Sequence, residues 1–541
     1  MDIINNKLVI APLMTHIELF AGCGGLSLGL ETAGFNLVMA NELSPMASET
    51  FARNILNADL VEQSNIDKVL WLSSIHSRKD IQNRFRENPT VAGGLKKQHH
   101  SDIKGKQFLD KELDRSLLIG SITDLNKILE NDKNGLLKQL KSGLGSGGVD
   151  LVSGGPPCQS FSLAGLRDHR NQRNMLPWEF AKFVGMVKPK IALLENVSGI
   201  LRAFDIDGEK HFAWLEVAKA FAKVRYIPLC LHINAKYVGA AQNRPRFILI
   251  AMRKDVYRTF KKATTDEGLL SALESSKLFL DMIESGQEPE IGAIKCFDIE
   301  KEHALFASGT LSALRTHTID QLVTVEAAID DLRSKKLNQS TYVKNINRRF
   351  RNVHSFVLNT AANHEFRTHG SKVRARFRLN QVLNNLDTAN ASNLRNYIKY
   401  AVGAELDKQL IKEVAKHWLL DLDGKVINKG SLKQIAVLLQ ELRTHKHSQR
   451  ALQPNRPAPA VLGSPDDTSH YYESESTQRT LTVRELARIQ SFPDWYEFKS
   501  KVTTGGQSRK FEVPQYTQVG NAVPPLLGEA LGRVCKDILG Y

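Results

Sequence analysis

A glycine-rich turn near the N-terminus lies between a short apolar run and a segment with helical spacing. Residues 16–20 form the apolar run, residues 21–25 read Ala-Gly-Cys-Gly-Gly, and residues 26–33 carry apolar side chains at helical spacing. A second apolar run at 36–40 ends at Asn41 and Glu42. Strand, helix and strand in this order predict a βαβ unit, which commits the chain to a parallel sheet covered by helices.

Further short apolar runs continue this rhythm at 117–119, 149–152, 191–194 and 247–251. Each run is followed by turn residues and then by a helical stretch, so we expect an α/β fold with a doubly wound, mainly parallel sheet. Residues 60–116 are polar and show no clear period. We interpret them as an insertion on the surface.

The pattern changes after residue 255. Helical spacing appears around 406–411 and 435–442, with Ser431 as the predicted N-cap of the second helix. Prolines between 453 and 467 indicate a connector or an irregular strand, and 483–490 is helical. We therefore predict a first domain at 1–255, a second at 256–480, and a segment at 481–541 that returns to the first.

Composition narrows the class of protein. Hydrophobic residues make up 42% of the 541 residues, which is ordinary for a globular chain and excludes a disordered one. No run approaches the ~18 apolar residues of a membrane helix, and the start lacks the pattern of a secretory signal, so we expect a cytoplasmic protein. Five cysteines without metal-type spacing favour neither a disulfide framework nor a metal site.

The net charge of +15 is concentrated between residues 301 and 450. Within 341–380, Glu365 is the single acidic residue among nine basic ones: Lys344, Arg348, Arg349, Arg351, Arg367, Lys372, Arg374, Arg376 and Arg378. Such a concentration of one sign indicates a surface for phosphates, although a solvated, solubilising face has the same composition. If residues 374–378 form a strand, Arg374, Arg376 and Arg378 share one face of it.

The glycine-rich turn and Glu42 together suggest a nucleotide-type cofactor. Glycines let backbone amides approach a ligand at a helix N-terminus, and Glu42 at the end of the next strand can accept bonds from ribose hydroxyls. This arrangement suits a nicotinamide, a flavin or S-adenosylmethionine equally well. A tight turn without a ligand is the alternative.

Cys158 is the candidate nucleophile. It follows Gly-Gly-Pro-Pro at the end of the strand predicted at 149–152, where open α/β sheets bind ligands. Its neighbours are prolines, Gln159 and Ser160, whereas a buried inert cysteine would have apolar ones. Cys23 is the rival thiol, but its place inside the glycine-rich turn favours a packing role.

Two further polar groups belong to this edge of the sheet. Glu195 directly follows the apolar run at 191–194. It can serve as an acid, or it caps the following turn. Gln242, Arg244 and Arg246 project to one side if their segment is extended, as donors to a base or to phosphates. An exposed basic turn is the alternative for that segment.

Six strings in this order, FAGCGG, GGPPCQSFS, ENV, QNRPRF, RELARIQSFP and QVGNAVPP, resemble the DNA (cytosine-5) methyltransferase family. They cover about 1–58, 117–255 and 450–541, and a chain without added regulatory domains is similar to the bacterial restriction-modification type. In that family the long variable stretch before RELARIQSFP holds the target-recognition domain. The resemblance implies the S-adenosylmethionine-dependent methyltransferase fold.

The resemblance also implies roles for single residues. S-adenosylmethionine would be held by Phe20, Gly22, Gly24 and Glu42, with Leu176, Asn521 and Val523 closing over it. Cys158 would be the nucleophile, Glu195 and Arg244 would hold the flipped cytosine with support from Arg246, and Ser162 would face its backbone. An acidic residue usual at the adenine is replaced by Ser121, whose hydroxyl can still accept that bond.

The implied reaction is methyl transfer from S-adenosylmethionine to carbon 5 of a cytosine in duplex DNA, after the base is flipped out and Cys158 adds to it. A cognate restriction endonuclease would be the functional counterpart, and we expect a monomer.

Four alternative functions remain open. A nicotinamide or flavin oxidoreductase shares the glycine turn, and a cysteine hydrolase would need His169 near the thiol. A catalytically silent DNA-binding relative would be expected to lack Cys158 or Glu195. A tRNA methyltransferase would have a smaller variable domain.

Overall fold

A single nine-stranded sheet organises the larger part of the molecule. The computed structural model describes residues 14–59, 65–88, 99–104, 106, 113–157, 175–206, 208–333, 337–350, 362–446, 448–461, 463, 468–474 and 478–541. Across the sheet the strands follow the order β12 (Cys296–Asp298), β9 (Tyr226–Asn234), β11 (Pro245–Arg253), β6 (Ile191–Val197), β5 (Leu151–Gly154), β1 (Met14–Leu19), β2 (Phe35–Glu42), β4 (Ser116–Ile119) and β3 (Val69–Trp71).

The predicted fold class is confirmed. All neighbouring strands run parallel except β11, which is antiparallel to both β6 and β9. The six apolar runs of the sequence are strands β1, β2, β4, β5, β6 and β11. Strands β3, β9 and β12 were not predicted.

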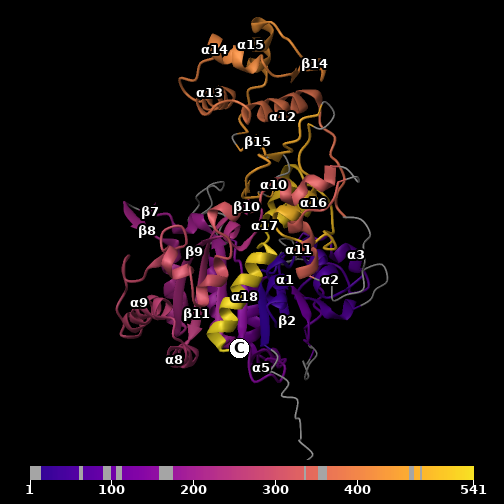
Figure 1. Cartoon of the computed structure of the whole chain (residues 1–541). Helices are drawn as coiled ribbons and strands as arrows, with labels where there is room; N and C mark the ends of the chain where they lie inside the picture. Colours follow the sequence, from indigo (N-terminus) through magenta and orange to yellow (C-terminus); the bar gives the residue numbers. More distant parts are fainter. Residues whose placement is uncertain are drawn as a thin grey trace, which may run out of the picture.

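Helices cover the sheet in two groups. One consists of α4 (Ile122–Asn131), α5 (Leu136–Ser142), α6 (Leu176–Val187), α7 (Ala213–Lys223) and α9 (Glu267–Glu284), which contact one another in a series through α6 and α7. In the other, α1 (Gly25–Thr32) and α8 (Lys254–Ala263) both pack on α18 (Pro525–Leu539), so the C-terminal helix lies against the first helix of the chain (Figure 1). Two more helices, α2 (Pro45–Ile55) and the short α3 (Ile81–Arg84), follow β2 and β3.

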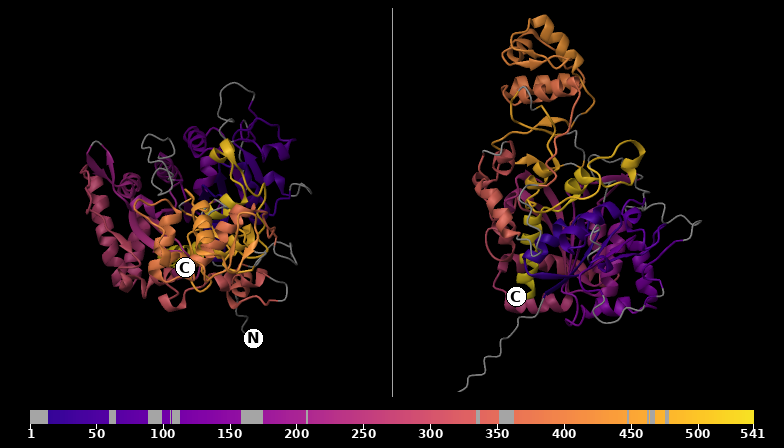
Figure 2. Two further views of the ribbon diagram at one scale, coloured as in Figure 1. Left: turned by 90° about the horizontal axis from the view of Figure 1, so that it is seen from above. Right: turned by 90° about the vertical axis from the view of Figure 1, so that its right-hand side faces the viewer.

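A second hydrophobic core stands apart from the first. It is formed by α12 (Ser371–Leu383), α13 (Thr388–Ile398), α14 (Lys408–Val414), α15 (Leu432–Glu441) and the hairpin of β13 (Leu419–Leu420) with β14 (Val426–Ile427). This small helical module, residues 371–446, projects beyond the sheet domain (Figures 1 and 2). The predicted helices at 406–411 and 435–442 are α14 and α15, and the Ser431 hydroxyl accepts a bond from the Gln434 N–H as the expected N-cap.

The domain boundary predicted at 255 needs correction. Phe260 of α8, Phe279 of α9 and Ile329 of α10 (Val325–Ile329) are buried in the first core, and β12 extends its sheet. The α11 helix (Thr341–Arg349) packs there as well. The physical reason is that edge strand β9 needs a partner and a cover, which 256–333 supplies. The second module therefore begins near 370.

The stretch 60–116 is also more than a surface insertion. Its β3 pairs with β4 at the edge of the main sheet, and Trp71 and Phe85 are fully buried. Residues 60–64, 89–98, 105 and 107–112 of this stretch lie outside the described part of the chain.

The return from the second module to the first domain uses short elements. These are β15 (Arg450–Ala451) with β17 (Thr468–Ser469), β16 (Ala458–Pro459) with β10 (Gln242–Asn243), and the helices α16 (Val483–Ile489) and α17 (Gln515–Asn521). A separate hairpin is formed by β7 (Phe204–Ile206) and β8 (Glu209–His211). The predicted helix at 483–490 is α16, which a Thr482–Glu485 capping box starts.

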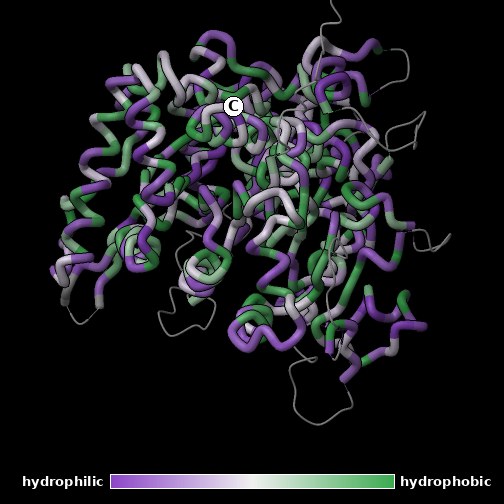
Figure 3. The backbone as a smooth tube through the Cα atoms, turned by 90° about the horizontal axis from the view of Figure 1, so that it is seen from below, coloured by the Kyte–Doolittle hydropathy of each residue, from purple (hydrophilic) through white to green (hydrophobic). Residues whose placement is uncertain are grey.

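Purple and green alternate along the peripheral helices in Figure 3, as amphipathic helices require. Within the described ranges, no helix has both the length and the apolarity needed to cross a bilayer.

Candidate active site

Glu42 fastens the glycine-rich turn between β1 and α1. One carboxylate oxygen accepts the Gly22 N–H at 2.8 Å and the other accepts the Ser44 N–H at 2.7 Å. Burial raises the pKa of this carboxyl, and the backbone donors lower it in part. Gly22 and Gly24 have φ of +55° and +89°, which favour glycine, and a Cβ on Gly22 would meet no atom within 4 Å. The turn thus leaves open space beside a carboxylate, which fits a ribose-bearing cofactor.

The segment 521–523 lies against this same turn although it is distant in sequence. A Cβ on Gly25 would overlap the carbonyl oxygen of Val523, so the two backbones touch. Asn521 at the end of α17 is exposed. Phe20 is half-buried with its ring in edge contact with Phe180 of α6, at 6.4 Å between centroids.

Two other expected cofactor residues also occupy ends of elements. Ser121 follows β4 and its hydroxyl caps α4 by accepting the Thr123 N–H at 3.2 Å. That bond leaves the second lone pair of the hydroxyl for another donor. Leu176 is the first residue of α6 and is half-buried against the first core.

Cys158 and Ser162 lie outside the described residues, but the segment leading to Cys158 is held firmly. The Asn196 side chain donates to the Pro156 carbonyl at 3.1 Å, which ties the end of β6 to the loop after β5. A Cβ on Gly155 would lie 3.2 Å from a carboxylate oxygen of Glu195. The chain therefore passes beside Glu195 only three residues before Cys158.

Cys23, the rival thiol, is a packing residue. It is 2% exposed, and burial raises its pKa far above the usual value, so the thiolate is disfavoured.

Arg246, not Arg244, pairs with Glu195. The Arg246 Nε lies 2.6 Å from Glu195 Oε1, because antiparallel pairing of β11 with β6 sets Ile248 opposite Glu195 and brings Arg246 to the same end of the sheet. Both side chains are about one-tenth exposed. Burial lowers the pKa of Arg246, and the Glu195 carboxylate opposes that shift.

Gln242, Arg244 and Arg246 are buried and alternate with the more exposed Asn243 and Pro245, as a shared side requires, but contacts within the protein occupy the side chains of Gln242 and Arg244. Arg244 donates to the carbonyls of Val461, Gly520 and Ala522 at 2.9–3.2 Å. Gln242 is fully buried and donates to the carbonyl of Ile489 and the side chain of Gln490. In both cases tertiary contacts from the C-terminal segment occupy the side chain, which alternation along a strand cannot reveal.

Sequence reasoning missed Asn196 and Glu18. Asn196 follows Glu195 directly, and its position at a strand end was the available signal. Glu18 is buried in β1, accepts a bond from the Ser27 hydroxyl, and has a pKa raised by burial to about 8. Nothing in the sequence pattern distinguishes it from a solvent-facing strand residue.

The basic residues Arg374, Arg376 and Arg378 lie on helix α12, so the strand considered for them is wrong and they do not share one face. Arg378 is 1% exposed, lies over the Trp418 ring and pairs with Glu473 at 2.9 Å. Arg374 approaches Gln478, whereas the Arg376 Nε donates to the Leu442 carbonyl.

Comparison with known proteins identifies what this arrangement is similar to. The family model of C-5 cytosine-specific DNA methylase matches residues 14–80 and 119–537. The type II methyltransferase M.DdeI of Desulfomicrobium norvegicum is 25% identical over 96% of this chain and 88% of its own length. The type II methyltransferase M.Bpa9945I of Bacillus paralicheniformis is 23% identical over 97% and 99%.

Among solved structures, a putative DNA modification methyltransferase encoded within an E. coli prophage is 20% identical. It covers 98% of this chain and 100% of its own, with a TM-score of 0.43.

Proposed function

The chain belongs to the C-5 cytosine-specific DNA methylase family, and from this premise we propose that it methylates carbon 5 of a cytosine in duplex DNA through a covalent adduct with Cys158. The match over 14–80 and 119–537 carries the proposal, because it includes both the glycine-rich turn and the C-terminal segment. The proposed methyl donor is S-adenosylmethionine. The proposed biological role is protection of DNA from a cognate restriction endonuclease, as a monomer, in the cytoplasm.

Attack by a thiolate explains the need for Cys158. Carbon 5 of cytosine is a poor nucleophile and lies inside the base stack, so the base must first be flipped out. A bond from the Cys158 sulfur to carbon 6 moves the ring π electrons toward carbon 5, which then takes the methyl group. Removal of the carbon 5 proton and elimination of the sulfur restore the ring and free Cys158.

Glu195 and Arg246 form the group that we assign to the cytosine. Glu195 in its protonated form would donate to ring nitrogen 3 and relieve the negative charge that the addition creates. Arg246 lies within 2.6 Å of that carboxyl and would orient it and approach the carbonyl oxygen at position 2. Arg244 is proposed to position the segment 520–522 through its bonds to backbone carbonyls.

The cofactor residues fit S-adenosylmethionine, which supplies an electrophilic methyl group when bound. Glu42 would accept the ribose hydroxyls with the lone pairs that Gly22 and Ser44 leave unused. Asn521 and Val523 would close the site from the C-terminal side, since their segment touches the glycine-rich turn.

Trapping on modified DNA tests the nucleophile. Random-sequence duplexes with 5-fluorocytosine in place of cytosine should become covalently linked to the wild-type chain, because fluorine cannot leave as a proton does. Cys158→Ser should form no adduct while it still binds S-adenosylmethionine in calorimetry, and the matched control Cys23→Ser should form it. An adduct with Cys158→Ser and none with Cys23→Ser would overturn the assignment.

A further inference from the structure

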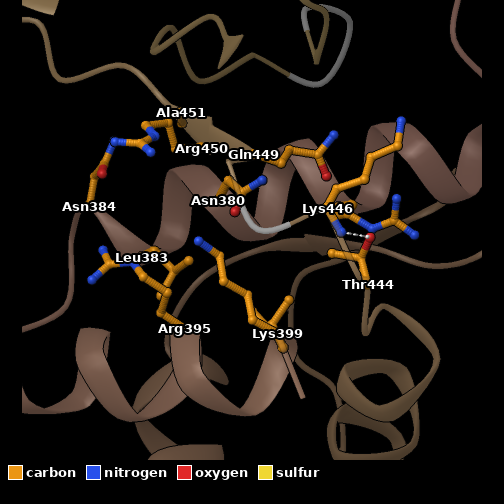
Figure 4. A pocket seen from close by; sticks show the side chains of 12 residues that line it. Asn380, Leu383, Asn384, Arg395, Lys399, Thr444, Lys446, Gln449, Arg450 and Ala451 are labelled. Atoms are coloured by element: carbon orange, nitrogen blue, oxygen red, sulfur yellow. Dashed lines mark hydrogen bonds between the residues drawn. The ribbon is translucent and has the colours of Figure 1, made fainter. Parts of the chain in front are cut away.

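A basic hollow opens beside the second module between α12, α13 and residues 444–446 and 449–451. Five of the side chains around it are cationic, from Arg376, Arg395, Lys399, Lys446 and Arg450 (Figure 4). Among the described residues that line it there is no carboxylate. The described lining of the hollow is therefore strongly positive.

Asn380 supplies a neutral donor to the same place. It is 6% exposed, and its side-chain nitrogen is buried without a hydrogen-bond partner within the described structure. A buried amide N–H without an acceptor is costly, and an acceptor supplied by a ligand would remove that cost. In Figure 4 the side chains of Asn380 and Lys399 point into the space between α12 and α13.

The electrostatics favour an anion. Burial and the nearby guanidinium groups of Arg450 and Arg395 lower the pKa of the Lys399 ammonium. An anion between these groups would relieve that repulsion and would accept the Asn380 N–H.

The sequence neighbours of the lining residues favour a nucleic acid over a free ion. Tyr400, which follows Lys399, stacks on His445 at 4.6 Å between ring centroids, and the Arg443 guanidinium lies 3.9 Å from the Tyr400 ring centre. Tyr400 is 45% exposed. Aromatic faces interleaved with cations are typical of surfaces that contact nucleic acids.

We propose that this hollow clamps one backbone phosphate of the DNA, held by Arg395, Lys399 and Arg450 with Asn380 donating its side-chain N–H. The proposal rests on the proposed function, and it moves the main phosphate contact of the basic region from Arg374 and Arg378 to residues 395–450. A phosphate contact positions the module on the duplex without reading sequence.

The salt dependence of DNA binding by the full chain tests the clamp. Anisotropy of a labelled random-sequence duplex should give a log–log slope that is shallower by about 0.9 for Lys399→Gln and for Arg450→Gln. The double variant should flatten the slope by no more than this, because both side chains hold one phosphate. Lys412→Gln on α14, which removes one charge outside the hollow, is the matched control and should keep the wild-type slope. Unchanged slopes in both hollow variants would overturn the proposal.

Asn380→Asp separates binding from folding. The new carboxylate would pair with the surrounding cations, so the melting temperature should hold or rise, while DNA affinity at low salt should fall severalfold. A fall in both would indicate a structural role for Asn380 and contradict the clamp.

Two further arms identify the ligand and keep the two proposals apart. In one outcome, inorganic phosphate raises the melting temperature of the wild type but not of the double variant, while the two proteins have equal salt slopes for DNA binding. In that case the hollow holds a free phosphate and the DNA assignment is overturned. Methyl incorporation into genomic DNA is measured on the same preparations. If the hollow variants show the expected changes in slope while the wild type transfers no methyl group, the proposed function alone would be contradicted.

Discussion

Glu42 has two roles at once, and a pair of variants can separate them. Glu42→Ala removes the proposed ribose acceptor and also the acceptor for the Gly22 and Ser44 N–H groups. We expect it to weaken S-adenosylmethionine binding by about 1–3 kcal/mol in calorimetry. Glu42→Gln keeps one oxygen acceptor and should lose less. Equal affinities of wild type and Glu42→Ala would remove Glu42 from the cofactor site.

Glu18 makes the stability of the fold depend on pH. Its pKa is about 8 in the folded chain against an ordinary value of 4.5, so between these values the unfolded chain releases a proton that the folded chain keeps. The stability from this group is full below about pH 4.5 and is lost as the pH rises to about 8.

The free energy of unfolding of Glu18→Gln should therefore rise relative to that of the wild type by about 1–4 kcal/mol between pH 5 and pH 8, measured by denaturant unfolding. A constant difference between the two proteins across this range would contradict the buried, protonated Glu18. Neighbouring His16 has the opposite effect on stability. Burial lowers its pKa from 6.5 to about 3, so the stability from this group is lost as the pH falls between these values.

The contact of α1 with α18 depends on a glycine. A Cβ on Gly29 would overlap the Glu529 nitrogen and the Pro525 carbonyl oxygen, which are backbone atoms that cannot move aside. Gly29→Ala should destabilise the fold by about 1–3 kcal/mol in thermal unfolding, despite the better helix propensity of alanine. Gly505→Ala, where a Cβ meets nothing within 4 Å, is the control and should stay within about 0.5 kcal/mol of the wild type. Equal melting temperatures for the two variants would mean that α1 and α18 can move apart with little loss of stability.

Prediction of single elements from the sequence succeeded where the signal is local. The runs at 16–20, 36–40, 117–119, 149–152, 191–194 and 247–251 are strands, and Ser431 caps α15 as expected. The edge strands β3 and β12 have only three residues each, too few to show a period. The nine-residue β9 was missed although all but one of its residues are buried.

Because the second module has a hydrophobic core of its own, we expect that it can be removed without unfolding the first domain. Lys372 and Glu441 form an ion pair at 3.4 Å, so the ends of the segment between them are close in space. Replacement of residues 374–440 by a short Gly-Ser linker should leave cofactor binding and cooperative unfolding of the first domain, measured by calorimetry. DNA affinity and its salt slope should both fall. Loss of cooperative unfolding would mean that the first core depends on the second.

Local sequence was enough to place Glu42 at the end of a strand and Glu195 near the end of another, because strand and helix periods and turn residues are properties of neighbouring positions. The roles of arginines depended on distant segments: β11–β6 register pairs Arg246 with Glu195, the C-terminal carbonyls hold Arg244, and Trp418 covers Arg378. The attachment of 256–333 to the first core was likewise decided by the exposed edge and face of β9. Side-chain partners and domain limits of this kind follow from packing between residues far apart in the chain, which no local pattern contains.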